Sequence, residues 1–565
     1  MSHKKIFSEC DDVSRWQNIV VYQIYPKSFC DTTGTGSGDL KGITGKLDYL
    51  KNLGVDAIWL TPIYPSPMVD NGYDISDYTS IDPEYGTPED FDELISEARK
   101  RNIFIIMDLV YNHTSDKHAW FLQSESGRDN PKSDRYIWRD AKPDGSPPTN
   151  WRGIFGGSAW TWSRKRRQYY LHTFAKEQPD LNWENPDVRR ALYDAANFWL
   201  RKGVGGFRID AIVYIKKPAE FVDGKPDEDG TCSVHNMTAG TPGILDFLHE
   251  FRREVFDGKN ILTVAEANSV KPEELNEWVG RDGVFDMLFE FNHVNIMFPG
   301  GETWHAVSEW KLSDWKKTFT ASQKATAHNG RYPIFFENHD KPRAVNNFFP
   351  PDADKNLAAK ALATVLFTLR GTPFVFEGQE LGYTNVAYDS IDAYDDISSH
   401  GQYKAAIDAG YSQGEALKFV QRFSRDNART PMQWTPGRNA GFTSGKAWLP
   451  IHDDYKTCNV ETEEDDENSV LNFYKKIIAL RKSNKTLIEG RYEELLPESE
   501  KVFAFKRILG DEIFYTVVNF TTAEILLPEE FFDGAEKVLG NYDDEQKNIL
   551  RPLESVIYKK VLRKD

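Results

Sequence analysis

Four short segments of this chain bring acidic side chains and histidines to the end of an apolar, β-type stretch. They are residues 108–113, 207–210, 264–266 and 338–340. Parallel strands of a barrel deliver their carboxyl ends to one rim, so carboxylates that are distant in sequence can meet there in one pocket. Hydrolysis of a glycoside needs one carboxylic acid to protonate the leaving oxygen and a second carboxylate to attack or to activate water. The four segments therefore favour a glycosidase.

The residue types within these segments suggest separate roles. Arg208 and Asp210 lie two apart and so share one face of a strand, where the guanidinium could hold the Asp210 carboxylate ionised and oriented as a nucleophile. Glu266 follows an apolar run, and apolar surroundings raise the pKa of a carboxyl group, which suits a general acid. Asp340, beside His339, would then bind sugar hydroxyls.

Each of these residues also has an ordinary structural interpretation. An acidic residue at a strand end, taken alone, is usually a helix cap or an ion-pair partner and not a functional group. His113 and His339 are singly more typical of satisfied structural histidines, and Trp151, Phe155 and Trp160 are singly more typical of a core than of a sugar platform. The functional reading rests on the combination.

The elements that must position these residues alternate along the chain as β-type runs and amphipathic helices, which is the pattern of βα units around a parallel sheet. The candidate strands are residues 20–25, 57–61, 104–110, 206–211, 261–267, 287–291, 332–337 and 373–377. Eight such strands predict an α/β protein built on a closed (β/α)8 TIM barrel.

Two helices between these strands have recognisable ends. Thr87 is a suitable N-cap with Pro88 at the first helical position, and Asn185 and Pro186 repeat that pattern, with Gly203 as the stop. Apolar residues at helical spacing follow each cap: Phe91, Leu94, Ile95 and Ala98 in the first helix, and Val188, Leu192, Ala195, Ala196 and Trp199 in the second.

Two regions depart from the βα pattern. Residues 114–183, after the third strand, are rich in Trp, Gly, Pro and charge and do not repeat the βα pattern, and long insertions at a rim are often functional. After residue 486 short β runs at 502–506, 513–520 and 556–558, with Gly510 in a turn, predict a C-terminal antiparallel β domain. We therefore divide the chain into barrel residues 1–113 and 184–485, inserted residues 114–183 and C-terminal residues 486–565.

Composition excludes several kinds of partner. The net charge of −18 argues against nucleic acid, whose binding relies on Lys and Arg. We find no apolar stretch of about 18 residues for a membrane span, and the start at Met1 has no run suited to a signal peptide. Four scattered cysteines without CxxC spacing predict reduced thiols. We expect a cytoplasmic monomer or weak homo-oligomer that acts on a small oligosaccharide.

The chain resembles glycoside hydrolase family 13, the α-amylase family, and within it the oligo-1,6-glucosidase and α-glucosidase branch. The resemblance covers nearly the whole chain and runs through the family's signatures at residues 54–62, 108–113, 178–182, 206–210, 266, 338–340 and 371–380. It implies a (β/α)8 barrel and retention of the α configuration through a covalent glucosyl intermediate, with the two carboxyl groups about 5 to 5.5 Å apart.

The resemblance also implies roles for individual residues. Asp210 would be the nucleophile, Glu266 the general acid/base and Asp340 the transition-state stabiliser. Asp70 and Arg425 resemble the pair that closes the pocket on the terminal glucose, which implies exo-action on short substrates. The remaining sugar-binding candidates are Tyr73, Asp108, His113, Phe155, Arg208, Ala211 and His339.

Two positions bear on the substrate. Pro179, within residues 178–182, matches the oligo-1,6-glucosidase signature, whereas trehalose-6-phosphate hydrolases, otherwise similar, tend to carry Ala there. Ala211 stands where strict α-1,6 enzymes carry Val and α-1,4-active relatives carry Thr or Ala. A smaller side chain widens the aglycone side, so we expect activity on α-1,6 and α-1,4 linkages and on sucrose. Such a change is worth only ~1 to 3 kcal/mol.

Other activities on the same scaffold are alternatives. Sucrose isomerases add an Arg- and Asp-rich loop after the last histidine motif, and residues 343–350 do not match it, which favours hydrolysis over isomerisation. Transglucosylation competes wherever an acceptor sugar reaches the intermediate. A non-catalytic binding protein, like the transporter heavy chains that resemble this family, would lack the intact acid set and carry a membrane span.

The loop at residues 31–39 resembles the calcium or magnesium loop of this branch. Its candidate ligands are Asp31, Thr33, Thr35, Ser37 and Asp39. Thr33 and Thr35 replace the usual Asn and Asp, and fewer anionic oxygens weaken the binding of a hard cation. A Gly-rich turn without a metal is the alternative, and we expect no cofactor to be required for the reaction.

Overall fold

The computed structural model describes residues 16–562, apart from residues 228, 269, 272, 281, 299–300, 302, 328–329, 533, 545 and 547. The start of the chain, on which the signal-peptide expectation rests, and Cys10 lie outside these residues. Within the described ranges Cys30, Cys232 and Cys458 are free thiols, as expected. None of the helices in those ranges has the length and apolar character needed to cross a bilayer.

Eight parallel strands form the central sheet, in the order β11-β10-β8-β3-β2-β1-β13-β12. Each overlaps one of the predicted runs, so the barrel prediction is confirmed. The strands are β1 (Val21–Ile24), β2 (Ala57–Leu60), β3 (Phe104–Val110), β8 (Gly206–Asp210), β10 (Leu262–Glu266), β11 (Met287–Phe289), β12 (Pro333–Ile334) and β13 (Thr372–Phe376).

The barrel closes at one seam by packing. Among the described residues no ladder joins β11 to β12. The rings of Phe289 and Phe291 lie 5.2 and 5.4 Å from the ring of Phe335, and they fill this seam. Strand β12 has two residues where six were predicted, and Pro333 within it has no N–H with which to extend a ladder.

Both predicted helices form with the expected ends. Helix α4 (Pro88–Lys100) begins with a capping box, in which Thr87 Oγ1 accepts from the Asp90 N–H at 3.2 Å and Asp90 Oδ2 accepts from the Thr87 N–H at 2.9 Å. Helix α6 (Pro186–Lys202) ends at Gly203, whose φ of 98° is left-handed. The predicted apolar faces are buried, at Phe91, Leu94, Ile95 and Ala98 and at Val188, Leu192, Ala195, Ala196 and Trp199.

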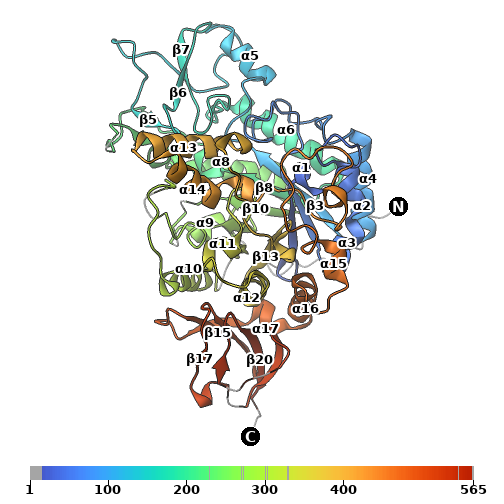
Figure 1. Ribbon diagram of the computed structural model, residues 1–565. Coiled ribbons are helices and arrows are strands. Elements are labelled where there is room, and N and C mark those ends of the chain that lie inside the picture. Colours follow the sequence, from blue (N-terminus) through green and yellow to red (C-terminus); the bar gives the residue numbers. More distant parts are fainter. Residues whose placement is uncertain are drawn as a thin grey trace.

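The remaining helices lie mostly around the barrel (Figure 1). They are α1 (Pro26–Phe29), α2 (Leu40–Gly45), α3 (Leu47–Leu53), α5 (Ala119–Glu125), α7 (Val234–Thr238), α8 (Ile244–Phe251), α9 (Leu275–Trp278), α10 (Leu312–Ala325), α11 (Ala344–Phe348), α12 (Lys355–Thr368), α13 (Ile397–Asp408), α14 (Gln413–Phe423), α15 (Val460–Glu464), α16 (Val470–Ser483) and α17 (Lys485–Glu489).

The insertion after β3 stands above one end of the barrel (Figure 1). Its sheet has the order β4-β7-β6, with β4 (Trp138–Arg139), β6 (Trp160–Ser163) and β7 (Gln168–Leu171). Trp151 and Trp160 are buried in its own small core, so they fill that core and do not form a sugar platform.

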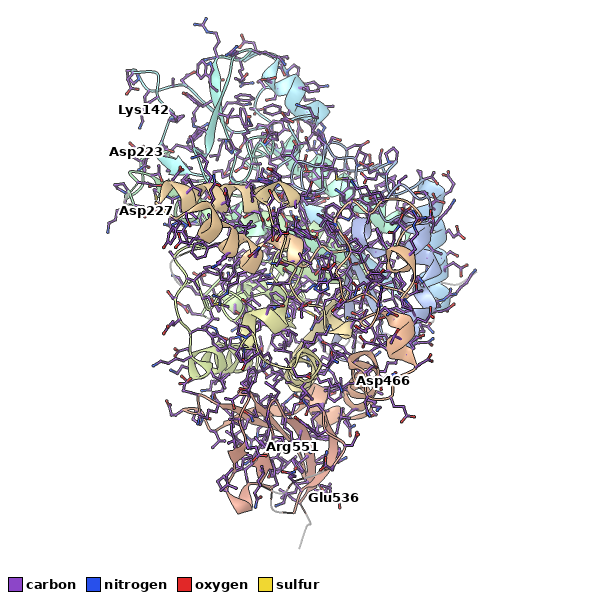
Figure 2. The ribbon with its side chains drawn as sticks, viewed as in Figure 1. Lys142, Asp223, Asp227, Asp466, Glu536 and Arg551 are labelled. Atoms are coloured by element: carbon purple, nitrogen blue, oxygen red, sulfur yellow. The ribbon has the colours of Figure 1, made fainter. Side chains whose placement is uncertain are left out.

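The insertion is tied to the segment that follows β8. Strand β5 (Trp151–Arg152) pairs in parallel with β9 (Cys232–Ser233). An ion pair of 3.0 Å between Lys142 Nζ and Asp223 Oδ2 adds to this junction at the edge of the molecule (Figure 2). Two loops that leave the barrel from neighbouring strands therefore form one unit.

The C-terminal sheet lies at the opposite end of the barrel from the insertion (Figure 1). It is antiparallel with the order β14-β15-β16-β20-β18, from β14 (Arg491–Leu495), β15 (Val502–Leu509), β16 (Glu512–Asn519), β18 (Glu536–Gly540) and β20 (Ser555–Val561), beside a pair of β17 (Ile525–Leu526) and β19 (Ile549–Leu550). Gly510, with φ of 61°, turns the chain between β15 and β16. Trp315 of α10 packs against the rings of Phe503 and Phe520 and joins this sheet to the barrel.

Candidate active site

The predicted acidic residues lie at the carboxyl ends of their strands. Asp108 is on β3, Asp210 ends β8, Glu266 ends β10, and Asp340 follows β12 by six residues. The parallel register pairs Asp108 with Arg208 and Val110 with Asp210, so β3 and β8 present these side chains at the same level. The barrel therefore brings together residues that are up to 232 positions apart, as the sequence predicted.

Arg208 is the centre of this group. Its Nη1 donates to Asp108 Oδ1 at 2.8 Å and to Asp210 Oδ1 at 2.7 Å, and its Nη2 forms an ion pair with Glu266 Oε2. Burial opposes the charge of Arg208, but Asp108 and Asp210 outweigh burial and raise its pKa above the ordinary value. One guanidinium thus fixes three carboxylates relative to one another.

Asp210 is held by Arg208 in the predicted way, but its environment is less favourable to charge than we expected. Burial raises the pKa of Asp210 to about 6, with Arg208 opposing this shift and Asp108 adding to it. At neutral pH the carboxylate is still mostly ionised. Its side chain is 12% exposed, so a ligand can reach it from the rim.

Glu266 differs from the sequence expectation in its surroundings. The residues before it, Val264 and Ala265, are buried in the barrel wall. The carboxyl group itself, 21% exposed, contacts the guanidinium of Arg208, because β10 pairs directly with β8. The expected apolar environment therefore surrounds the strand but not the carboxyl group.

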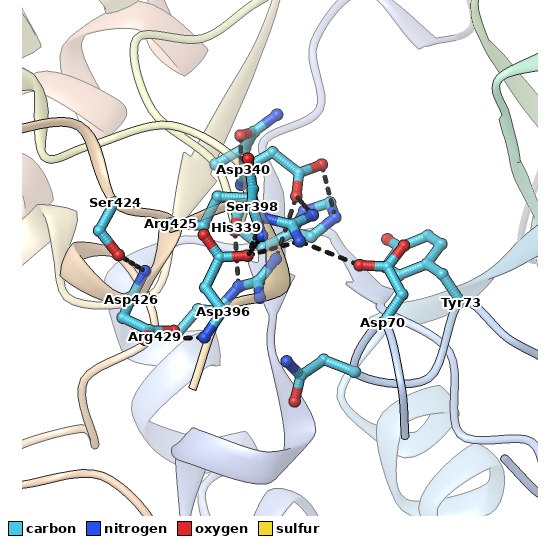
Figure 3. Close-up of polar contacts among 12 residues, drawn as sticks. Asp70, Tyr73, His339, Asp340, Asp396, Ser398, Ser424, Arg425, Asp426 and Arg429 are labelled. Atoms are coloured by element: carbon cyan, nitrogen blue, oxygen red, sulfur yellow. Dashed lines mark hydrogen bonds and ion pairs between the residues drawn. The ribbon is translucent and has the colours of Figure 1, made fainter. Parts of the chain in front are cut away.

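Asp340 lies in a cationic cluster (Figure 3). Its Oδ2 is 3.0 Å from His339 Nε2, and its Oδ1 is 3.2 Å from Arg425 Nη1 and 3.1 Å from Arg429 Nη2. Burial opposes ionisation of Asp340, but His339, Arg425 and Arg429 outweigh it and hold the pKa well below the ordinary value. Asp340 is therefore an anion throughout the neutral and mildly acidic range.

The predicted closing pair, Asp70 and Arg425, is formed (Figure 3). Arg425 Nη2 is 3.0 Å from Asp70 Oδ1, and Gln178 Nε2 donates to Asp70 Oδ2 at 3.1 Å. The guanidinium of Arg425 also lies over the half-buried ring of Phe155, 5.2 Å from its centroid. This contact brings the insertion to the pocket, so the predicted aromatic Phe155 does border the site.

Tyr73 and His339 form a flat wall next to Asp108. Their rings stack 5.2 Å apart with 5° between their planes, and Tyr73 Oη donates to Asp108 Oδ2 at 2.9 Å. Trp59, which we had not singled out, donates its Nε1 proton to the same oxygen at 3.2 Å. Trp59 lies within residues 54–62, one of the segments that resemble the family, and this position is the sequence signal that could have identified it.

Both predicted histidines are buried, and burial lowers the pKa of each below the ordinary value. Gln23 Nε2 donates to His339 Nδ1 at 2.7 Å, so the neutral ring carries its proton on Nε2 and donates it to Asp340. His113 Nε2 donates to the Tyr73 carbonyl at 3.1 Å. His339 thus orients an acid, while His113 fixes the loop that carries Tyr73.

Ala211 follows Asp210 in a left-handed conformation, with φ of 42° and ψ of 35°. Residues other than glycine seldom adopt this region, and such strain is typical of functional sites. Ala211 is buried and opens a short 3-10 turn, Ile212–Tyr214. The residue next to the nucleophile candidate Asp210 therefore has a small buried side chain on a strained backbone.

Asp396 is a member of the site that the sequence did not point to. Its Oδ1 accepts from Arg425 Nε at 2.7 Å, and its Oδ2 accepts from the hydroxyl of Ser399 at 2.9 Å. Asp396 is fully buried at the start of α13. It therefore fixes the arginine that reaches both Asp70 and Asp340 (Figure 3).

The loop at residues 31–39 is satisfied by its own hydrogen bonds. Asp31 Oδ1 accepts from the Thr33 N–H, the Thr33 hydroxyl and the Gly34 N–H at 2.8 to 2.9 Å, and Oδ2 accepts from the Gly36 N–H at 2.7 Å and from a Thr443 hydroxyl. Donors thus surround the Asp31 carboxylate, which leaves it little capacity for a cation.

The rest of this loop follows the same pattern. Asp39 accepts from Thr32 and caps α2 through the Gly42 N–H, and Thr35 Oγ1 donates to the Ser37 carbonyl. No group of three or more His, Cys, Asp or Glu arranged for a metal occurs in the described part of the chain. This arrangement favours the hydrogen-bonded turn, and a cation in the loop stays a prediction that no observation here tests.

Comparison with known proteins identifies the family. The profile of the alpha-amylase catalytic domain matches residues 23–490. The oligo-1,6-glucosidase of Parageobacillus thermoglucosidasius is 43% identical over 557 residues, which cover 96% of this chain and 98% of that enzyme. The trehalose-6-phosphate hydrolase of Escherichia coli is 44% identical over 547 residues, which cover 96% of this chain and 98% of that one.

Solved structures agree with this result. The isomaltulose synthase of Erwinia rhapontici superimposes with a TM-score of 0.90 at 42% identity, covering 96% of this chain and 98% of that one. The trehalose-6-phosphate hydrolase of Bacillus licheniformis gives a TM-score of 0.90 at 41% identity, covering 97% of this chain and all of that one. The chain belongs to the α-amylase family and is a glycoside hydrolase.

Proposed function

We propose that this enzyme is a retaining, exo-acting α-glucosidase that releases glucose from the non-reducing end of short α-glucosides. The observation that carries the proposal is the guanidinium of Arg208 holding Asp108, Asp210 and Glu266 together. Two carboxyl groups on neighbouring nitrogens of one guanidinium are close enough for the spacing of about 5 to 5.5 Å that retention needs.

The reaction uses the three acids in sequence. Asp210 attacks the anomeric carbon while Glu266 donates a proton to the glycosidic oxygen, so the C–O bond breaks and a glucosyl ester forms on Asp210. Glu266, now a carboxylate, takes a proton from water, which attacks the same carbon and restores Asp210. Asp340, kept anionic by His339, Arg425 and Arg429, stabilises the positive charge that develops on the sugar in both steps.

The exo mode and the linkage follow from the pocket walls. The ion pair between Arg425 and Asp70 closes the side beyond the terminal glucose, so a longer chain cannot pass. On the other side the small side chain of Ala211 leaves room for different aglycones. The preferred substrates in this proposal are isomaltose and isomalto-oligosaccharides, followed by α-1,4-linked glucosides and sucrose.

The direct test is release of 4-nitrophenol from its α-glucoside. Asp210→Asn should reduce kcat by about 10⁴-fold or more, because the amide is a poor nucleophile. Asp187→Asn changes an exposed aspartate of α6 in the same way and should retain full activity. Unchanged turnover by Asp210→Asn would contradict the assignment.

A trehalose-6-phosphate hydrolase is the second candidate, because relatives with that name are as similar to this chain as the oligo-1,6-glucosidases are. Initial rates on isomaltose, maltose, sucrose, trehalose and trehalose-6-phosphate separate the two. A preference for the phosphorylated sugar would overturn our ranking. Formation of isomaltulose from sucrose would identify an isomerase, and higher glucosides formed at high sugar concentration would reveal transglucosylation.

The proposal also covers the metal requirement of the enzyme and its cellular location. All the chemistry above is performed by side chains, so we expect dialysis against a chelator to leave activity and the thermal unfolding temperature unchanged. A loss restored by Ca²⁺ or Mg²⁺ would assign a cation to residues 31–39.

The free thiols Cys30, Cys232 and Cys458 suit the reducing cytoplasm, and fractionation of producing cells tests that location.

A further inference from the structure

Four arginines gather at the base of the barrel, at the end opposite to the acids. Arg331 and Arg370 each precede a strand by two residues, and the register pairs Pro333 of β12 with Thr372 of β13. The two arginines therefore enter the base side by side. Arg481 comes from α16 and Arg507 from β15 of the C-terminal sheet. We call these four residues the base cluster.

Arg481 and Arg507 are fixed in place by backbone carbonyls. Arg481 Nη1 donates to the carbonyls of Phe367 and Leu369, and Arg507 Nη1 donates to that of Thr368, at 2.7 to 3.0 Å. Both arginines also donate to the carbonyl of Leu487, at 3.1 and 2.7 Å, so their guanidinium groups are adjacent. Two guanidinium groups therefore hold the backbone of residues 367–369, which lead into Arg370.

The charge of the base cluster is not balanced by the protein. Within the described ranges none of the four arginines forms an ion pair with a carboxylate, and Arg331, Arg481 and Arg507 are each at most 2% exposed. The carboxylate that acts on Arg331 is Glu489, which is exposed and pairs with Lys485 at 3.3 Å. Buried charges are costly unless they are paired, so this imbalance needs a cause.

Unused donors belong to the same cluster. Arg331 Nε and Nη1 and Arg481 Nε are buried and have no acceptor in the described part of the protein. Burial, with Arg370 and Arg481 adding to it, lowers the pKa of Arg331 to about 8, so the group is still a cation at neutral pH. The Nε–H and Nη1–H of Arg331 leave the guanidinium on different sides, so each is a separate charge-assisted donor that an anion could use.

We propose that the base cluster is a binding site for a small inorganic anion, held chiefly by Arg331 and Arg481. A halide or a phosphate would accept the unused N–H groups and offset the uncompensated charge. Because the four arginines come from the barrel, from α16 and from the C-terminal sheet, the anion would hold these three parts together. The site is separate from the catalytic rim, so its role is in stability.

The test compares thermal unfolding of the full-length protein in chloride, bromide, phosphate and gluconate at equal ionic strength. Gluconate is too large for a buried site. A bound anion stabilises the folded state in proportion to the logarithm of its concentration, so the unfolding temperature should rise by a few degrees from gluconate to the anion that binds. The pattern among chloride, bromide and phosphate identifies the class of anion.

Arg331→Met should abolish this anion dependence. Arg491→Met is the matched control, because Arg491 lies on β14 of the same C-terminal sheet but is 64% exposed, and it should keep the full dependence. Initial hydrolysis rates at low temperature should be the same for wild type and both variants.

Anomalous diffraction from wild-type crystals grown in bromide provides a measurement that needs no variant. A peak beside the Arg331 guanidinium supports the proposal even if Arg331→Met fails to fold. Equal unfolding temperatures in all salts, together with no peak at the base cluster, would overturn it. An anion dependence of equal size in Arg331→Met would also overturn it, since that effect would come from the surface.

Discussion

Arginines gather at both ends of this barrel, but their partners differ. At the catalytic rim Arg208, Arg425 and Arg429 each face at least one carboxylate. At the base Arg481 and Arg507 face backbone carbonyls instead. The rim arginines therefore set the ionisation of carboxyl groups. The base arginines hold the backbone in place, and no carboxylate of the described residues balances their positive charge. The same side chain acts as an electrostatic control in one setting and as a structural clamp in the other.

The largest effect should come from removing the centre of the rim. Arg208→Met leaves Asp108 buried without its cation, and breaking a buried pair in this way costs about 3 to 5 kcal/mol of stability. We also expect a loss of more than about 10²-fold in kcat/KM, because three carboxylates lose their common support. Denaturant unfolding and nitrophenol release measure the two effects.

Arg331→Met is the counterpart at the base. It removes a buried cation that has no carboxylate partner, so in gluconate buffer its stability should equal or exceed that of the wild type. If Arg208→Met and Arg331→Met lower the free energy of unfolding by the same amount, the contrast between the two ends of the barrel is wrong.

Asp210→Asn should stabilise the protein at neutral pH while it abolishes activity. The pKa of Asp210 is about 6 in the folded state and about 4 in an unfolded chain, so the folded state binds the proton more tightly. Wild-type stability therefore contains a cost that is absent below about pH 4, grows as pH rises to about 6, and reaches ~3 kcal/mol above it. The asparagine variant lacks that cost.

Unfolding free energies of both proteins at pH 4 and pH 7 test this. The difference should be near zero at pH 4 and favour the variant at pH 7. A constant difference between the two proteins across this range would show that burial does not set the pKa of Asp210. The same pKa predicts that kcat/KM of the wild type falls below about pH 6, as the nucleophile is protonated.

Asp396→Asn tests a residue that supports the site through Arg425. The amide can no longer offer two anionic oxygens to Arg425 and Ser399, so Arg425 should be less firmly held against Asp70. We expect KM for short glucosides to rise by about 10-fold with a smaller change in kcat, since hydrogen bonds to charged groups contribute about 1.5 to 3 kcal/mol. Asp392→Asn, an exposed aspartate just before α13, is the control and should change neither constant.

The smallest effect concerns linkage. Ala211→Val should lower kcat/KM for maltose and sucrose relative to isomaltose by about 10-fold, as a methyl-scale change is worth ~1 to 3 kcal/mol. A valine also adopts the left-handed conformation less readily than alanine, so a small drop in unfolding temperature should accompany it. Equal losses on all three sugars would show that Ala211 does not border the aglycone.

Much of this molecule could be predicted because the signals were local. The cap at Thr87, the stop at Gly203 and the apolar runs that end in Asp210 and Glu266 are readable from neighbouring residues. The convergence of the acids followed from barrel topology alone.

What could not be predicted depends on contacts between distant segments. The contact between Glu266 and Arg208 depends on which strands are neighbours, and the hold of Asp396 on Arg425 joins two loops that have no shared pattern. The base cluster was equally hidden, because a lone arginine in a sequence is most often an exposed residue.

The pairing of β5 with β9 has a consequence for how substrate enters. This pairing joins the loop that carries Phe155 to the segment that follows Asp210, so we expect the two to move together. If substrate entry displaces the loop that carries Phe155 from Arg425, it should displace the segment after Asp210 as well. A disulfide engineered between this paired unit and the barrel would stop turnover if entry requires that motion and would leave turnover intact if it does not.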